Sequence, residues 1–317
     1  VEDCADSLVE LAFDSGAILR THVVRPTWHF VLPEDIRWLL AATAPRIKAR
    51  DARRYAQLGL DTETLRQSGR VLVAALRGSG PLTRAEAASV LTAAGIDVEG
   101  QRLPYLLMHA ELDCLICSGP RRGSRHTYVL LEERAPQALD LPREEALAEL
   151  ARRYFSSHGP ATAKDFAGWA SLTLAEARAA IDAAGASLTA EELDGLRLWS
   201  AAEGPGSPSD PVGDSDRPLV HLVQGYDELI MGYSETKALL AAPGSAWTPA
   251  TPPVSSLVVL RDGRVAGFWR RAVKKDRVLV QTSLLDTWDA PSRAELAAEA
   301  ERSAAFLGLR LEFAVAD

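Results

Sequence analysis

The feature that most constrains the fold is a repeated turn-and-helix signal. Gly-Pro-x-Thr-x-x-acid occurs at 80–86 and again at 159–165, ending in Glu86 and Asp165. Threonine is a good helix N-cap, and an acidic side chain three residues later can return the hydrogen bond. Each copy is therefore predicted to start a short helix that is followed by a turn and a second helix.

A candidate β-hairpin follows each copy. Segment 112–133 contains an apolar strand, a loop of Gly, Pro and Arg, and a second strand. Segment 186–200 contains Asp194-Gly195, a dipeptide typical of tight hairpin turns.

The start of the chain has the same order, with a predicted helix over 4–13 and an extended, β-branched stretch over 15–31. Helix, turn, helix and hairpin, repeated three times, is the pattern of winged-helix modules, and a period of roughly 79 residues suits one module.

The composition changes at 201–217, which is rich in Gly, Pro, Ser and Asp and is predicted to be an exposed loop or linker. An apolar strand, an Asp262-Gly263 turn and an amphipathic helix over 293–309 follow it. We expect an α+β fold with tandem winged-helix modules and a small C-terminal β-rich domain with a capping helix. The expected boundaries are 1–58 for a partial first module, 59–138 for the second, 139–200 for the third, 201–217 for the linker and 218–317 for the β-rich domain.

The bulk composition excludes several classes. No apolar run approaches the length of a membrane span, and three cysteines are too few for a disulfide framework, which favours the cytoplasm. Cys114 and Cys117 form a single Cys-x-x-Cys on a predicted strand, where their side chains point to opposite faces, so we expect structural cysteines and no metal. No dinucleotide, P-loop or nucleophile-elbow motif occurs. We expect a monomer without cofactor.

The net charge of −8 makes local basic stretches stand out. Stretch 37–54 has six basic residues and one acidic, stretch 261–277 has seven and two, and stretch 119–127 has three arginines and a histidine. Each could be ordinary solvated surface, but together they favour nucleic-acid contacts. Trp269 could be a wedge between bases or a core residue. The DNA-binding candidates in these stretches are Arg121, Arg122, Arg264, Trp269, Arg270 and Arg271.

Asp227 follows a strongly apolar strand in "GYDELIMGY", where the chain leaves the predicted sheet. An acid at such a place either faces a cleft, as a catalytic candidate, or caps a helix and pairs with arginines.

Five stretches resemble, in order, the AlkZ-like winged-helix DNA glycosylases: "RTHVVRPTWHFVLPEDIRWLL", "AELDCLICSGPRRG", "RRYFSSHGPATAKDFAGWASLT", "GYDELIMGY" and "DGRVAGFWRR". The resemblance implies three winged-helix modules and a C-terminal β-domain around a concave DNA-binding surface. It also implies hydrolysis of the N-glycosidic bond of an alkylated or cross-linked base in double-stranded DNA. Such a reaction passes through an oxocarbenium-like sugar, whose charge the enzyme has to stabilise.

The resemblance carries over Arg25, Thr27 and His29. On one continuous strand they would share a face, with Trp28 and Phe30 on the opposite, core face. Pro26 would make the strand an edge or a bulge, and His22 would lie on the other side as the weaker candidate. We expect Arg25 and His29 to line the cleft, with His29 as an electrostatic or water-orienting catalytic group. Structural packing of His29 is the alternative.

The family's catalytic Gln-x-Gln or Gln-x-Asp, which precedes this strand, does not occur in the chain, because all six glutamines are isolated. We expect that it lies before Val1 or that this member lacks it. The two hypotheses are therefore a DNA glycosylase and a non-catalytic winged-helix DNA-binding or regulatory protein.

Overall fold

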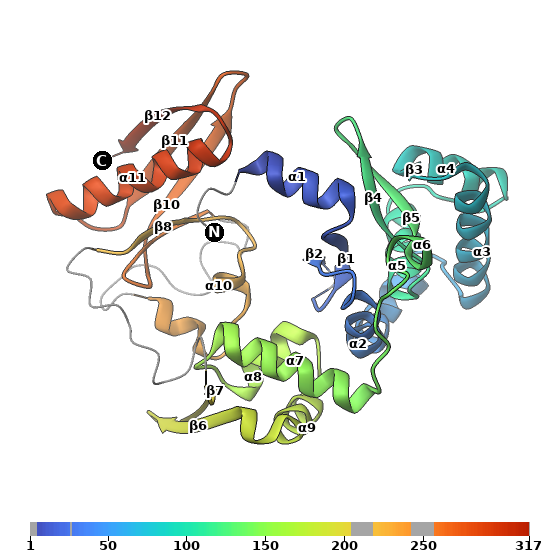
Figure 1. The fold of residues 1–317 in the computed structure, drawn as a ribbon, viewed down its shortest axis with the longest axis horizontal. Helices are drawn as coiled ribbons and strands as arrows, with labels where there is room; N and C mark the ends of the chain where they lie inside the picture. The colour runs from blue at the N-terminus through green and yellow to red at the C-terminus, as the bar shows by residue number, and fades with distance from the viewer. Residues whose placement is uncertain (1–4, 26, 204–217, 242–256, 317) are drawn as a thin grey trace. The chain divides into compact units, whose positions relative to one another are not determined.

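The computed structural model describes residues 5–25, 27–203, 218–241 and 257–316 (Figure 1). These residues form two compact units. One unit comprises 10–151 and 170–183, and the other comprises chiefly 152–169 and 184–316.

The helices and strands alternate along the chain. In the first part they are α1 (Asp6–Ser15), β1 (Leu19–Val23), β2 (Thr27–Val31), α2 (Ile36–Gln57), α3 (Thr62–Ser79), β3 (Leu82–Thr83), α4 (Arg84–Ala93), α5 (Arg102–Leu112), β4 (Ile116–Arg122), β5 (Arg125–Leu130) and α6 (Leu131–Arg134). In the rest they are α7 (Arg143–His158), α8 (Ala163–Ala170), α9 (Leu174–Ala184), β6 (Leu188–Leu193), β7 (Leu196–Ala201), β8 (Val220–Val223), α10 (Glu228–Met231), β9 (Val258–Arg261), β10 (Arg264–Val273), β11 (Arg277–Leu284), α11 (Ala290–Phe306) and β12 (Arg310–Ala316), with short 3-10 turns at Gly185–Ser187 and Thr236–Leu240.

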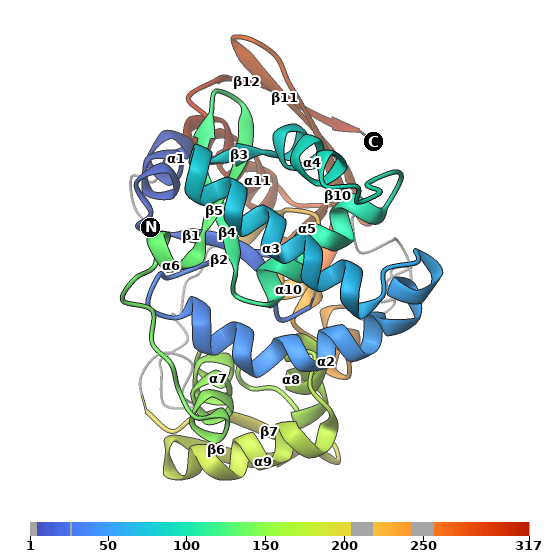
Figure 2. The same cartoon turned by 90° about the vertical axis from the view of Figure 1, so that its right-hand side faces the viewer.

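The first copy of the repeat forms as predicted. The Thr83 side chain accepts from the Glu86 N–H, and the Glu86 carboxylate accepts from the Thr83 N–H at 2.7 Å, so the capping box is complete at the start of α4. Helix α3 packs on α4 and α5 and crosses β5 (Figure 2). Strands β3, β5 and β4 form an antiparallel sheet in that order.

The second copy repeats this order of elements. The Thr162 hydroxyl accepts from the Asp165 N–H at 3.1 Å, and the Asp165 carboxylate accepts from the Thr162 N–H at 3.1 Å, which begins α8. Hairpin β6–β7 turns at Asp194 and Gly195, whose φ angles are 50° and 77°, as the predicted tight turn requires. A β-bridge from Ala161 to Trp199 stands where β3 stands in the first copy.

Asp165 has a second function in the fold. Its fully buried carboxylate also accepts from the backbone N–H groups of Ser234 at 2.7 Å, Glu235 at 2.6 Å and Thr236 at 3.2 Å. It therefore holds the chain after α10 against the start of α8.

The C-terminal part is a five-stranded sheet in the order β12-β11-β10-β9-β8. Helix α11 lies along one face (Figure 1), and Leu296 and Ala300 pack there against Val259 and Val280. The capping helix and the Asp262-Gly263 turn were predicted, whereas β12, which pairs parallel to β11, was not. Most of the predicted linker lies outside the described residues.

The first hairpin corrects the sequence interpretation. Residues 20–31 were expected to form one strand, but β1 and β2 pair as an antiparallel hairpin around a turn at Val24 and Arg25. Pro26 lies outside the described residues. The expected core residues Trp28 and Phe30 are 45% and 57% exposed. The reason is the reversal of the chain, because cross-strand partners share a face: His22 pairs with Trp28, so Trp28 lies on the polar face of β1.

Candidate functional site

The outward face of the first hairpin gathers a cation, an imidazole and an indole. The Arg20 guanidinium lies 4.4 Å from the ring centroid of Trp28, within the range of a cation–π contact. The His22 ring lies 4.8 Å from the same ring. Arg20 also donates to the Ser118 hydroxyl at 3.2 Å, and this contact ties the hairpin to β4.

A buried carboxylate lies beneath this face. Glu111 on α5 is fully buried, and its Oε2 forms a hydrogen-bonded ion pair with Nδ1 of His22. Its other oxygen has no hydrogen-bond partner among the described residues. Burial, and after it the charge of Glu111, raises the pKa of Tyr128 to about 12. Burial likewise lowers the pKa of Arg20. Because Glu111 is fully buried, its hydrogen bond to His22 is shielded from water and is stronger than the same bond at an open surface.

His22 is therefore better organised than the sequence suggested. On the continuous strand that the sequence predicted, His22 lay on the face opposite Arg25 and His29 and was the weaker site candidate. Its partner Glu111 is 89 residues away in the chain. A histidine at a hairpin start gives no local signal for a distant acid.

Arg25, Thr27 and His29 lie together at the end of the hairpin. Nη2 of Arg25 is 3.5 Å from Nε2 of His29, and the Thr27 hydroxyl donates to the Arg25 carbonyl at 2.8 Å. Nδ1 of His29 is 3.0 Å from the Thr27 carbonyl, which fixes the ring. The three candidates thus form one cluster, and Thr27 is exposed.

The hairpin β4–β5 carries Arg121 and Arg122. Arg121 donates to Glu10 at 2.6 Å, and its backbone N–H donates to Asp14 at 2.9 Å. Arg122 donates to Glu86 at 2.7 Å, although its side chain is more than half exposed. In this structure both arginines hold the hairpin to neighbouring helices, so DNA would have to compete with these carboxylates.

Trp269 on β10 is a core residue, which was the alternative to a wedge between bases. It is 5% exposed, and its indole N–H donates to the Val223 carbonyl at 2.9 Å. This position contradicts a role as a wedge between bases. Its exposed neighbours remain cationic: Arg270 donates to Gln281 at 2.7 Å, and Arg271 has no hydrogen bond or ion pair with the described chain. Arg264 donates to the Ala241 carbonyl at 2.8 Å.

Asp227 caps a helix, which is part of the structural role expected as the alternative to a catalytic one. Its side chain accepts from the Leu229 N–H at 2.9 Å and caps α10. The neighbouring Glu228, which the sequence did not single out, accepts from the indole N–H of Trp169 at 2.6 Å and lies 3.8 Å from His158.

Nearly the whole chain matches one known protein family. The family described as "DNA glycosylase AlkZ-like" matches residues 1–306. The chain belongs to the AlkZ-like DNA glycosylase family.

A solved AlkZ-like protein has the same fold. The structure of Streptomyces sahachiroi DNA glycosylase AlkZ superposes on this chain with a TM-score of 0.76 at 23% sequence identity. The superposition covers 97% of this chain and 84% of that protein. No curated protein sequence matches.

The described residues of this AlkZ-like protein offer neither a cluster of metal ligands nor a membrane-spanning helix. No group of three His, Cys, Asp or Glu side chains that could hold a metal ion occurs in the described ranges. Cys114 and Cys117 are free thiols, and burial raises the pKa of Cys117 to about 12, so it is an inert, structural cysteine. Cys4 lies outside the described residues. No helix in the described parts is both long and apolar enough to cross a bilayer.

Proposed function

We propose that the protein is a DNA glycosylase that hydrolyses the N-glycosidic bond of alkylated or cross-linked bases in double-stranded DNA. Membership of the AlkZ-like family over residues 1–306 carries this proposal. The fold shared with AlkZ, itself described as a DNA glycosylase, supports it.

The proposal includes the architecture. The order α3, β3, α4, α5, β4, β5 supports a winged-helix module over 59–138, and α7 to β7 supports another over 139–200. Residues 1–58 would contribute the hairpin and following helix of a first module, and 218–317 the β-rich domain. The chain would act as a monomer on duplex DNA.

The chemistry assigns roles to the first hairpin. An N-alkylated purine is already cationic and a good leaving group, so the protein has to bind the duplex, place water and stabilise a positive sugar. Arg25 would hold a phosphate at the end of the hairpin, and Thr27 would assist it. His29, fixed by the Thr27 carbonyl, would orient water beside the sugar.

The rival function is a non-catalytic DNA-binding protein. Residues 1–317 contain no Gln-x-Gln or Gln-x-Asp, so the family's catalytic motif cannot be assigned within them. Both functions require DNA binding, and only one requires base release, so the two activities have to be measured on the same protein.

The experiment follows single-turnover release of N7-methylguanine from a duplex by the full-length protein. We expect His29→Ala to slow release by about 100-fold while DNA binding changes little. The matched control is His221→Ala, since His221 is exposed on β8. Binding without release would establish the rival function, and the absence of both would contradict the two functions together.

A further inference from the structure

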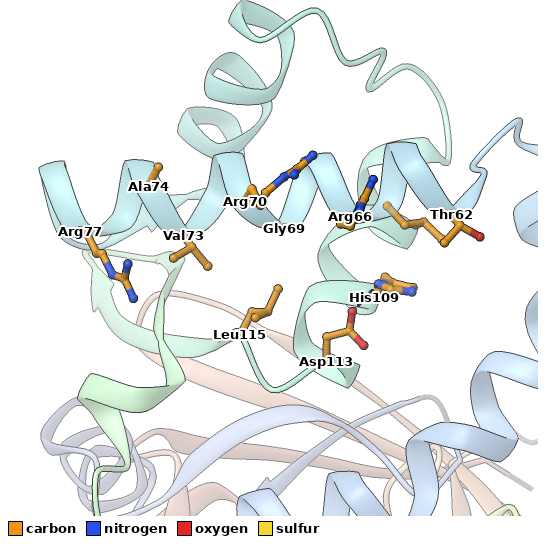
Figure 3. A pocket seen from close by; sticks show the side chains of 11 residues that line it. Thr62, Arg66, Gly69, Arg70, Val73, Ala74, Arg77, His109, Asp113 and Leu115 are labelled. Carbon is orange, nitrogen blue, oxygen red and sulfur yellow. Dashed lines mark ion pairs between the residues drawn. The ribbon is translucent and has the colours of Figure 1, made fainter.

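A slot whose lining includes none of the DNA-binding candidates runs along α3. Its volume is about 720 Å³, which is within the usual range of small-molecule pockets. It is lined by one side of α3 from Thr62 to Arg77, by the end of α5 and by the turn before β4 (Figure 3). By helical rise, this stretch of α3 is about 22 Å long.

The centre of the slot is apolar. Leu65, Gly69 and Val73 recur every fourth residue on α3 and form one wall. Leu115 and Val73 point toward one another across the slot (Figure 3). A Cβ on Gly69 would come within 2.8 Å of Leu115, so glycine lets Leu115 approach the helix. Leu65 and Val73 are only half-buried, and nothing in the described chain covers them fully.

The surroundings of the slot are cationic. Arg66, Arg70 and Arg77 line it together with a single carboxylate, Asp113. That carboxylate is already satisfied, because it pairs with Lys48 and with His109, whose Nδ1 is 3.2 Å away. Although burial opposes ionisation, these two partners lower the pKa of Asp113 to about 2.

Arg77 pairs with Glu132 at 2.8 Å, whereas Arg66 and Arg70 are only partly neutralised by their neighbours. Arg66 and Arg70 share one acid, Glu63, and both are 63% exposed. Two guanidinium groups on one carboxylate leave a surplus positive charge beside the apolar wall.

A second cavity of about 520 Å³ adjoins this one, because Thr62, Leu65 and His109 line both. Tyr55 lines the second cavity, is 6% exposed, and its hydroxyl has no hydrogen-bond partner in the described chain. Buried hydroxyl groups are normally hydrogen-bonded, so the Tyr55 hydroxyl could bond a polar group that enters this cavity.

We propose that the slot along α3 binds a small organic anion with a flat, apolar body. The body would lie along the Leu65–Val73 stripe beside Leu115, and the negative group would face Arg66 and Arg70. A DNA backbone fits less well, because its phosphates would leave the apolar wall uncovered. The site is separate from the first hairpin and does not depend on the proposed glycosylase activity.

The test is a fluorescence titration of the full chain with 1-anilinonaphthalene-8-sulfonate and with its uncharged relative N-phenyl-1-naphthylamine. We expect saturable, one-to-one binding of the sulfonate. Val73→Gln should weaken it by about tenfold, whereas Val71→Gln, a half-buried valine outside the slot, should leave it within about twofold.

The charge requirement is tested separately. The double variant Arg66→Gln and Arg70→Gln should weaken binding of the sulfonate about fivefold and leave the uncharged dye unchanged. Both arginines are exposed, so this variant is expected to fold even if Val73→Gln does not. The proposal would be overturned if neither Val73→Gln nor the double arginine variant changed the affinity for the sulfonate. Displacement of the sulfonate by unmodified duplex DNA would also overturn it.

Discussion

At the scale of the residue, two fully buried carboxylates, Asp165 and Glu111, differ in how many hydrogen bonds compensate for their loss of solvent. Asp165 accepts hydrogen bonds from four residues: Thr162, Ser234, Glu235 and Thr236. Glu111 has His22 on one oxygen and no partner in the described chain on the other. The first carboxylate is a structural clamp. The second is an incompletely satisfied group beside a candidate site, where such groups are most often functional.

Asp165→Asn should lower the free energy of unfolding by about 3 kcal/mol at pH 7, because an amide has only one accepting oxygen and its NH2 group cannot accept the remaining hydrogen bonds. Burial alone would raise the pKa of Asp165 in the folded protein, but hydrogen bonds from Ser234, Thr162 and Glu235 lower that pKa. Its contribution is therefore complete above the unfolded pKa of about 3.9 and is lost as the pH falls through the lower folded value. Urea unfolding between pH 3 and 7 checks this, with the exposed Asp182→Asn as control.

His22→Ala should destabilise the protein by about 3 kcal/mol, because it leaves the buried Glu111 side chain without its hydrogen-bond partner. His29→Ala, at the more open end of the same hairpin, should cost less than about 1 kcal/mol. Unfolding in urea compares the two. Equal costs would show that the hydrogen bond between His22 and Glu111 contributes little to stability.

At the scale of the element, local signals were sufficient where one turn or cap determines the structure. The capping boxes at Thr83 and Thr162 and the Asp194-Gly195 turn formed as predicted because the groups involved are neighbours in the chain. The first hairpin was misassigned because its buried face depends on long-range partners. The parallel strand β12 was missed because only its pairing with β11 defines it.

The hairpin β10–β11 should supply part of the salt-dependent DNA affinity. Arg270→Ala with Arg271→Ala should reduce the slope of log affinity against log salt by about 2, since each phosphate contact contributes about 0.9. Fluorescence anisotropy with a duplex at several salt concentrations measures the slope. Arg178→Ala, exposed on α9 and outside the basic stretches, is the control and should leave it unchanged.

At the scale of the whole molecule, the family and the fold agree, and the net charge of −8 requires that DNA contacts be local. The catalytic role of His29 was inferred from a resemblance, and the structure adds its neighbours, Arg25 and Thr27. The structure also reduces the DNA-binding set, since Trp269 belongs to the core.

The central claim is base excision. The most direct measurement is detection by mass spectrometry of free N7-methylguanine, with a matching abasic site, after incubation of the full-length protein with a methylated duplex. The account predicts release from the methylated duplex and none from the same unmodified sequence. An intact methylated duplex that remains bound to the protein would contradict it.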